Sequence, residues 1–169
     1  ALGRPGEDVA DRWLTAEELG LGPEHVAEII RVMMDERWYM LDSESLEVYA
    51  PVHAWRVLAD LRAEEAIPAL IEVLARSDEV WDEWATEEIP QVLGLIGPAA
   101  IPALSDYLEG RNSELYSCSD AARAMKEIAA RHPEVRDRVV GILTAKLERH
   151  AEQDEYLNSS LIDCLIDLK

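Results

Sequence analysis

The sequence predicts an all-α protein made of repeated helix pairs, and three observations carry this prediction. From Pro23 onward, apolar residues recur three, four and seven positions apart, which is the spacing of one helix face. No stretch longer than a few residues alternates apolar and polar positions as a half-buried strand does. The five-residue string Ala-Ile-Pro-Ala-Leu at residues 66–70 returns at residues 100–104, displaced by 34 positions. A period of this length is typical of stacked helix pairs.

The first expected element is an N-terminal capping segment, residues 1–49, with one long helix near residues 24–38. Pro23 suits the first turn of that helix, where a missing N–H costs no hydrogen bond. A stack of helix pairs needs such a cap to cover its first apolar face. The apolar positions of the helix are Val26, Ile29, Ile30 and Met33.

The remaining residues, 50–169, are expected to form the helix pairs. Pro68, Pro102 and Pro133 mark the start of the second helix in successive pairs, because proline is favoured in the first helical turn. The breakers between apolar stripes are short, which indicates short loops and antiparallel neighbours. The repeats are placed at about 50–76, 80–110 and 113–150, with a half repeat at 153–169.

Pro90 interrupts the apolar run from Trp84 to Ile96. Inside a helix, proline removes one backbone hydrogen bond and clashes with the preceding turn. We therefore expect either a kink in this helix or a helix that starts only near Glu87.

The residues around the repeated string resemble the HEAT-repeat family. Residues 93–97, Leu-Gly-Leu-Ile-Gly, followed by the string at 100–104, are similar to its short bacterial repeats, such as those of phycobilisome lyases. The resemblance covers about residues 50–169. It implies a right-handed α-α superhelix, a helix-pair solenoid. It says little about function, because the matching residues are core and turn residues.

Members of that family usually continue beyond the position equivalent to Lys169. If this carries over, the last helix lacks a partner helix. We expect its apolar stripe, Leu161, Leu165 and Leu168, to be exposed and to favour a homo-oligomer.

The composition of the chain limits the classes of partner that it can bind. The chain has 169 residues, 49 % of them hydrophobic, and 35 acidic against 16 basic side chains give a formal charge of −19. Such a surface repels nucleic-acid phosphates and anionic lipid headgroups, so we expect neither nucleic acid nor a membrane as the main partner. Two cysteines are too few for a disulfide framework, which favours a cytoplasmic protein.

No catalytic motif is recognisable. The sequence lacks a Gly-rich phosphate loop, a Gly-x-Ser-x-Gly elbow and a His-Glu-x-x-His helix, so we expect no enzyme and no cofactor. His25 with Glu28, and His150 with Asp154, have the spacing of one helix face, but two ligands do not make a metal site. Cys118 has no identifiable base.

The most unusual stretch is residues 77–88, which holds six acidic residues and two tryptophans. Trp81 and Trp84 are three apart, so one helix would place them on one face. Exposed tryptophans among acids would favour a basic partner. In the alternative, both indoles fill the groove between the first two repeats, because the chain has no Phe. The candidate partner-binding residues are Asp78, Glu79, Trp81, Asp82, Glu83, Trp84, Glu87 and Glu88.

One basic island lies inside this acidic chain. Residues 121–150 carry seven basic and four acidic side chains. They form either a docking patch for an acidic segment or a helix pair whose cations pair with neighbouring acids. The candidate docking residues are Arg123, Lys126, Arg131, Arg136 and Arg138.

The sequence thus predicts a non-enzymatic protein–protein interaction module, a HEAT-like scaffold whose mostly acidic groove holds a basic or mixed-charge protein or peptide. The alternative is an accessory or enzyme-like protein that binds a small ligand or a metal in that groove.

Overall fold

The structure, a computed structural model of the chain, describes residues 13–42, 44–80, 82–110 and 116–169, with only the backbone at residues 39 and 78–80. These residues form helices and no β-strand, which confirms the all-α class. None of the helices described combines the length and the apolarity that crossing a bilayer requires. The α-helices are α1 (Val26–Met33), α2 (Ala50–Asp60), α3 (Ile67–Val80), α4 (Glu83–Ile96), α5 (Ile101–Glu109), α6 (Tyr116–Arg131), α7 (Arg136–Glu148) and α8 (Glu155–Asp167).

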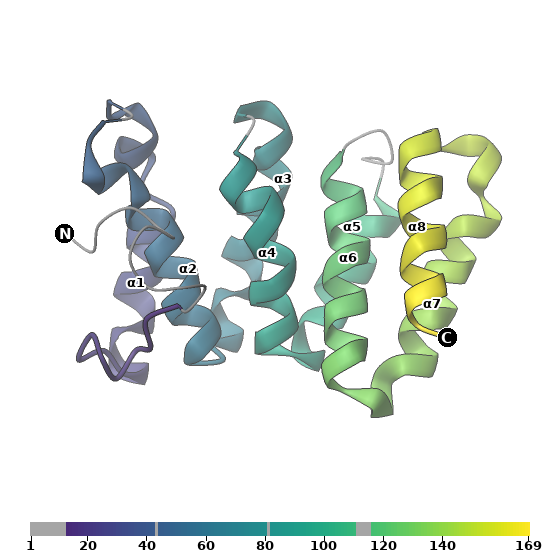
Figure 1. Ribbon diagram of the computed structural model, residues 1–169, viewed down its shortest axis with the longest axis horizontal. Coiled ribbons are helices and arrows are strands. Elements are labelled where there is room, and N and C mark those ends of the chain that lie inside the picture. Colours follow the sequence, from purple (N-terminus) through teal and green to yellow (C-terminus); the bar gives the residue numbers. More distant parts are fainter. Residues whose placement is uncertain (1–12, 43, 81, 111–115) are drawn as a thin grey trace.

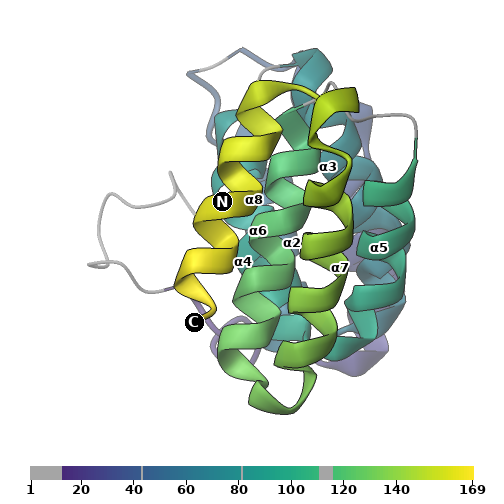
Figure 2. The same ribbon diagram turned by 90° about the vertical axis from the view of Figure 1, so that its right-hand side faces the viewer.

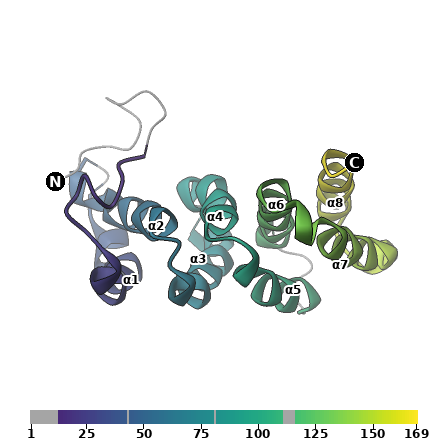
Figure 3. The same cartoon turned by 90° about the horizontal axis from the view of Figure 1, so that it is seen from below.

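The helices alternate between two rows. Figure 3 shows α1, α3, α5 and α7 in one row and α2, α4, α6 and α8 in the other. Within the second row, α2 packs on α4, α4 on α6 and α6 on α8. Between the rows, α1 packs on α2, α3 on α4, α5 on α6 and α7 on α8. Figure 1 shows the helix pairs in order from the N-terminal to the C-terminal end of the stack. Figure 2 shows α7 and α8 at the C-terminal end.

A single apolar core runs through this stack. Met33, Trp55, Leu93, Met125 and Leu161 come from five different helices, and all are fully buried. Burying each such side chain contributes roughly 1.5–3 kcal/mol, so the stack is stabilised along its whole length.

Prolines and one glycine set the helix boundaries. Pro68 and Pro102 are the second residues of α3 and α5, and Pro133 opens the 3₁₀ turn before α7, as the sequence predicts. Gly97 ends α4 with φ of 100°, a left-handed conformation that glycine adopts at little cost.

The single long helix expected near residues 24–38 is wrong. α1 ends at Met33, and a separate 3₁₀ turn follows at Glu36–Met40. Asp35 separates the two because its backbone is extended and its side chain accepts a hydrogen bond from the Arg37 N–H, at 3.0 Å. An aspartate in this position ends one helix and starts another.

Pro90 lies inside α4, which begins at Glu83, so the start expected near Glu87 is wrong. The helix begins earlier because the Asp82 carboxylate caps it. A kink at Pro90 stays a prediction.

The apolar stripe expected to be exposed on α8 is also largely wrong. Leu161 and Leu168 are buried, because they lie on the face of α8 that packs against α6 and α7. The exposed aliphatic residues of this helix are Ile162 and Ile166, 46 % and 54 % exposed.

Candidate binding site

The acidic-aromatic stretch of residues 77–88 does not form one helix. α3 continues to Val80, α4 begins at Glu83, and Asp82 between them is extended, with φ of −81° and ψ of 92°. The expectation that Trp81 and Trp84 share one face stays a prediction. Trp81 and the side chains of residues 78 and 79, Asp78 and Glu79, lie outside the described residues.

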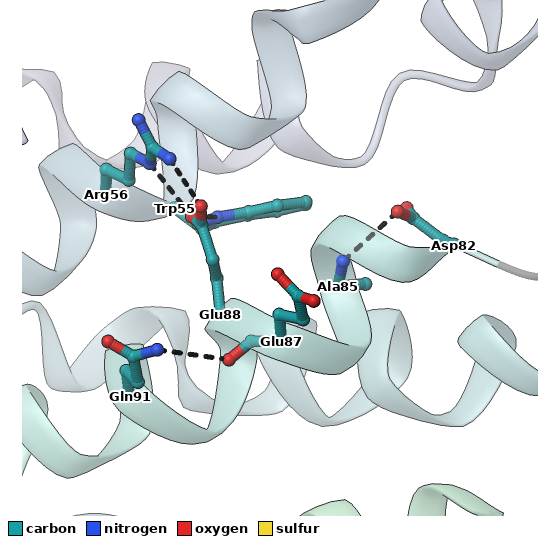
Figure 4. Close-up of polar contacts among 7 residues, drawn as sticks. All are labelled: Trp55, Arg56, Asp82, Ala85, Glu87, Glu88 and Gln91. Atoms are coloured by element: carbon teal, nitrogen blue, oxygen red, sulfur yellow. Dashed lines mark hydrogen bonds and ion pairs between the residues drawn. The ribbon is translucent and has the colours of Figure 1, made fainter. Parts of the chain in front are cut away.

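Asp82 is held in place by its role as the cap of α4. Its carboxylate accepts a hydrogen bond from the Ala85 N–H at 3.1 Å (Figure 4). Burial raises the pKa of the Asp82 carboxyl, although the backbone N–H groups of Ala85 and Trp84 act to lower it. Asp82 is therefore a partly desolvated carboxyl group at a fixed position.

Glu88 joins α4 to α2. The Trp55 Nε1–H and the Arg56 Nε–H donate to the same Glu88 oxygen, each at 2.8 Å, and a second Arg56 N–H donates to the other oxygen (Figure 4). The side chains of Arg56 and Glu88 are only 12 % and 8 % exposed. We therefore correct the assignment of Glu88 to the partner-binding surface, because its carboxylate is already bound inside the protein.

Trp84 is half-buried and packs among other aromatic and cationic groups. Its ring meets that of Tyr49 edge-on, with centroids 6.1 Å apart and planes at 81°. The Arg56 guanidinium lies 5.9 Å from the Trp84 centroid and 5.2 Å from that of Trp13. Trp84 is thus partly core and partly surface, a combination of the two interpretations of the sequence.

These residues border a cleft between the N-terminal ends of α2 and α4, which we call the α2–α4 cleft. Its volume is about 310 Å³. Asp82 supplies its one carboxylate, and the other lining side chains are aromatic or apolar. They are Met40, Val48, Tyr49, Pro51, Val52, Trp55 and Trp84.

Two further predicted residues, Glu83 and Glu87, lie on the first turns of α4 next to this cleft. Both are exposed, and neither forms an ion pair with another described residue. Because they are four positions apart, they share one face of α4. Together with Asp82 they make the start of α4 strongly acidic.

The basic island is mostly paired internally. Arg123 bonds Asp120 at 2.7 Å, and Lys126 bonds Asp167 of α8 at 3.0 Å. Both also line a polar cleft of about 310 Å³ between α6 and α8. The favourable contact with Asp167 raises the pKa of Lys126.

The other cations of the island are dispersed. Arg131 pairs with Glu127 on its own helix, whereas Arg136 donates to the Leu168 carbonyl at the end of α8. Arg138 is exposed and has no ion pair within the described part of the chain. This arrangement favours internal pairing over a single docking patch.

Sequence reasoning missed a second apolar pocket, between α1 and α2, which we call the N-terminal pocket. Its volume is about 390 Å³. The predicted pair His25 and Glu28 lies on its wall, and the His25 Nδ1 accepts the Gly22 N–H at 3.0 Å. The segment before α1 contributes Leu19 and Leu21. Nothing in the sequence shows that this segment lies over α2.

Metal-ligating side chains do not gather in the described part of the chain, where no group of three or more could hold a metal ion. His150 is exposed, and Asp154 caps α8 by accepting the Tyr156 N–H at 2.7 Å. Cys118 and Cys164 are buried and are not joined in a disulfide, and burial raises the pKa of the Cys164 thiol.

No protein-family model matches the chain, and no curated protein or solved structure matches it either. Its function has to be inferred from its own geometry.

Proposed function

We propose that this chain is a non-enzymatic protein-interaction module, a HEAT-like solenoid that holds a basic or mixed-charge segment of a partner protein on a mostly acidic surface. The two rows of helices and the repeated string support the solenoid. Because α2, α4, α6 and α8 form the more closely packed row, a right-handed superhelix of these pairs would be concave on that side.

The observation that carries this proposal is the acidic, aromatic start of α4. Glu83 and Glu87 are exposed and unpaired within the described chain, and they stand beside a cleft walled by Tyr49 and Trp84. Exposed acids attract and orient a basic segment, and aromatic side chains supply most of the contact energy at such interfaces.

The test is affinity capture from a lysate of the source cells with a Glu83→Gln/Glu87→Gln variant. Its matched control is Glu64→Gln/Glu65→Gln, which removes the same charge from two exposed acids in the 3₁₀ turn before α3. We expect capture by the wild type to fall as salt rises to about 0.5 M, because screening weakens exposed charge pairs. Capture should also fall in the α4 variant and persist in the control. Equal capture by both variants would contradict the proposal.

The N-terminal pocket favours a second function, the binding of a small apolar ligand. Its volume of about 390 Å³ lies within the range of ligand sites, and its walls are mostly apolar. Native mass spectrometry of protein purified from its source should then show a bound molecule, and the Ala50→Leu variant, which narrows the pocket, should lose it. A mass equal to that of the bare chain would remove this candidate.

Self-association through the end of the stack and a cytoplasmic location also stay predictions. If the former holds, the contact residues are Ile162 and Ile166, because the side chains of Leu161 and Leu168 are buried.

A further inference from the structure

We propose that the α2–α4 cleft binds the ammonium group of a lysine side chain, contributed by the basic partner. This inference rests on the proposed function and names the contact on which recognition would depend.

The aromatic walls suit a cation. The Tyr49 and Trp84 rings meet edge to face, with planes at 81° and centroids 6.1 Å apart, and both line the cleft. A cation within about 6 Å of an aromatic centroid is attracted by the negative face of the ring. The Arg56 guanidinium already uses Trp84 in this way at 5.9 Å, but Glu88 compensates its charge.

Asp82 supplies the opposite charge. The groups that act on it as hydrogen-bond donors are the backbone N–H groups of Ala85 and Trp84, and it forms no ion pair within the described chain. The charged side chains that influence it most are Glu88, which opposes its ionisation, and Arg76, which favours it. A carboxylate in this environment is poorly solvated, so an entering cation would be stabilised by it and would stabilise it in turn.

The geometry favours lysine over arginine. The Asp82 carboxylate already accepts the Ala85 N–H at Oδ1, and the Trp84 N–H also acts on it. An arginine fork binds a carboxylate best through both oxygens, whereas a lysine ammonium needs only one. Val48, Pro51 and Val52 line the cleft and would pack against the methylene stem of lysine.

The experiment compares two probes that differ only by the terminal ammonium group, Nα-acetyl-lysine methylamide and its uncharged analogue Nα-acetyl-norleucine methylamide. Binding is followed from amide shifts in NMR spectra of the full chain. We expect saturable binding of the lysine probe with a Kd on the order of 1 mM, the level expected of a ligand this small. The norleucine probe should bind at least about tenfold more weakly, a difference that corresponds to the loss of one charge contact.

Asp82→Asn is the decisive variant, because asparagine keeps the helix cap and removes the charge. We expect this variant to bind the lysine probe at least about tenfold more weakly than the wild type does. The matched control is Asp154→Asn at the cap of α8, which should leave binding unchanged. Trp84→Leu, which keeps apolar bulk but removes the ring, should also weaken binding, and it provides an independent test if Asp82→Asn does not fold.

Equal binding of both probes, or unchanged binding by Asp82→Asn and Trp84→Leu, would overturn this inference. So would the absence of saturable binding. If these results occur while salt-sensitive capture of a partner still depends on Glu83 and Glu87, the proposed interaction module is retained and only the lysine site is rejected. If capture is also insensitive to those two residues, both proposals fall.

Discussion

Glu88 shows how a single carboxylate can dock two helices. Burying an isolated carboxylate costs several kcal/mol, and in this protein three N–H groups from Trp55 and Arg56 compensate that cost. No feature of the sequence reveals this pairing, because Arg56 and Glu88 are 32 positions apart and each looks like an ordinary surface charge.

Replacing Glu88 by Ala should therefore destabilise the protein strongly. Arg56 and the Trp55 N–H would be left buried without an acceptor, so we expect the free energy of unfolding to fall by about 3 kcal/mol. Its neighbour Glu87 is exposed, and Glu87→Ala should change the same quantity by less than about 0.5 kcal/mol. Urea unfolding at neutral pH measures both variants. Similar losses of unfolding free energy in the two variants would show that the hydrogen bonds of Glu88 do not stabilise the contact between α2 and α4.

Asp82 should make stability depend on pH. Because its pKa is raised in the folded state, the folded protein holds that proton more tightly than the unfolded chain does. The contribution of Asp82 to stability is thus greatest below its ordinary pKa near 3.8 and declines as pH rises through the folded-state value. The Asp82→Asn variant lacks this decline.

The difference in unfolding free energy between Asp82→Asn and the wild type should therefore shift in favour of the variant between about pH 3 and pH 7. Parallel urea titrations across this range measure it. A shift in the opposite direction would mean that the carboxylate is stabilised in the folded state.

At the scale of elements, α4 and α6 depend on one glycine for their close contact. A Cβ at Gly94 would lie 2.7 Å from the Glu127 Cβ, a distance that real side chains do not tolerate. Gly141 of α7 provides the contrast, because a Cβ there would meet nothing within 4 Å.

Gly94→Ala should consequently lower the free energy of unfolding by about 1–3 kcal/mol through overpacking. Gly141→Ala should raise it by about 0.5–1 kcal/mol, because alanine is the better helix former. Thermal or urea unfolding of the two variants separates these effects. Stabilisation by both substitutions would show that α4 and α6 are not in close contact at Gly94.

The helices themselves follow from the sequence where apolar spacing and prolines agree, as at Pro68 and Pro102. The boundary predicted between the repeats at 50–76 and 80–110 lies close to the break between α3 and α4, but α3 extends to Val80 and the exact position of this break was not predicted. Aspartate is a common helix-capping residue, so Asp82 could have indicated where α4 starts, but the spacing of the apolar residues was given more weight.

At the scale of the molecule, the repeated string at residues 66–70 and 100–104 lies at the start of α3 and of α5, and the all-α class that it helps to predict is confirmed, whereas a superhelix stays a prediction. The two pockets could not be predicted, since they form where segments distant in sequence meet. The α2–α4 cleft joins residues 40–55 to residues 82–84, and the N-terminal pocket needs the segment before α1 to lie over α2.

Charge at this scale also distinguishes the first half of the stack from the second. The start of α4 carries exposed acids without partners in the described chain, whereas most cations of α6 and α7 are already bound to their neighbours. A basic ligand should therefore prefer the surface beside the α2–α4 cleft, because no internal ion pair must break there.

The most direct test of this account is an NMR titration of the ¹⁵N-labelled full chain with a peptide of alternating glycine and lysine. We predict that the largest amide shifts cluster at Tyr49 and residues 82–87, and that they diminish in Asp82→Asn. Shifts centred on Arg123 and Lys126, or on the N-terminal pocket, would contradict the assignment of the binding surface, as would a peptide that causes no shifts at all.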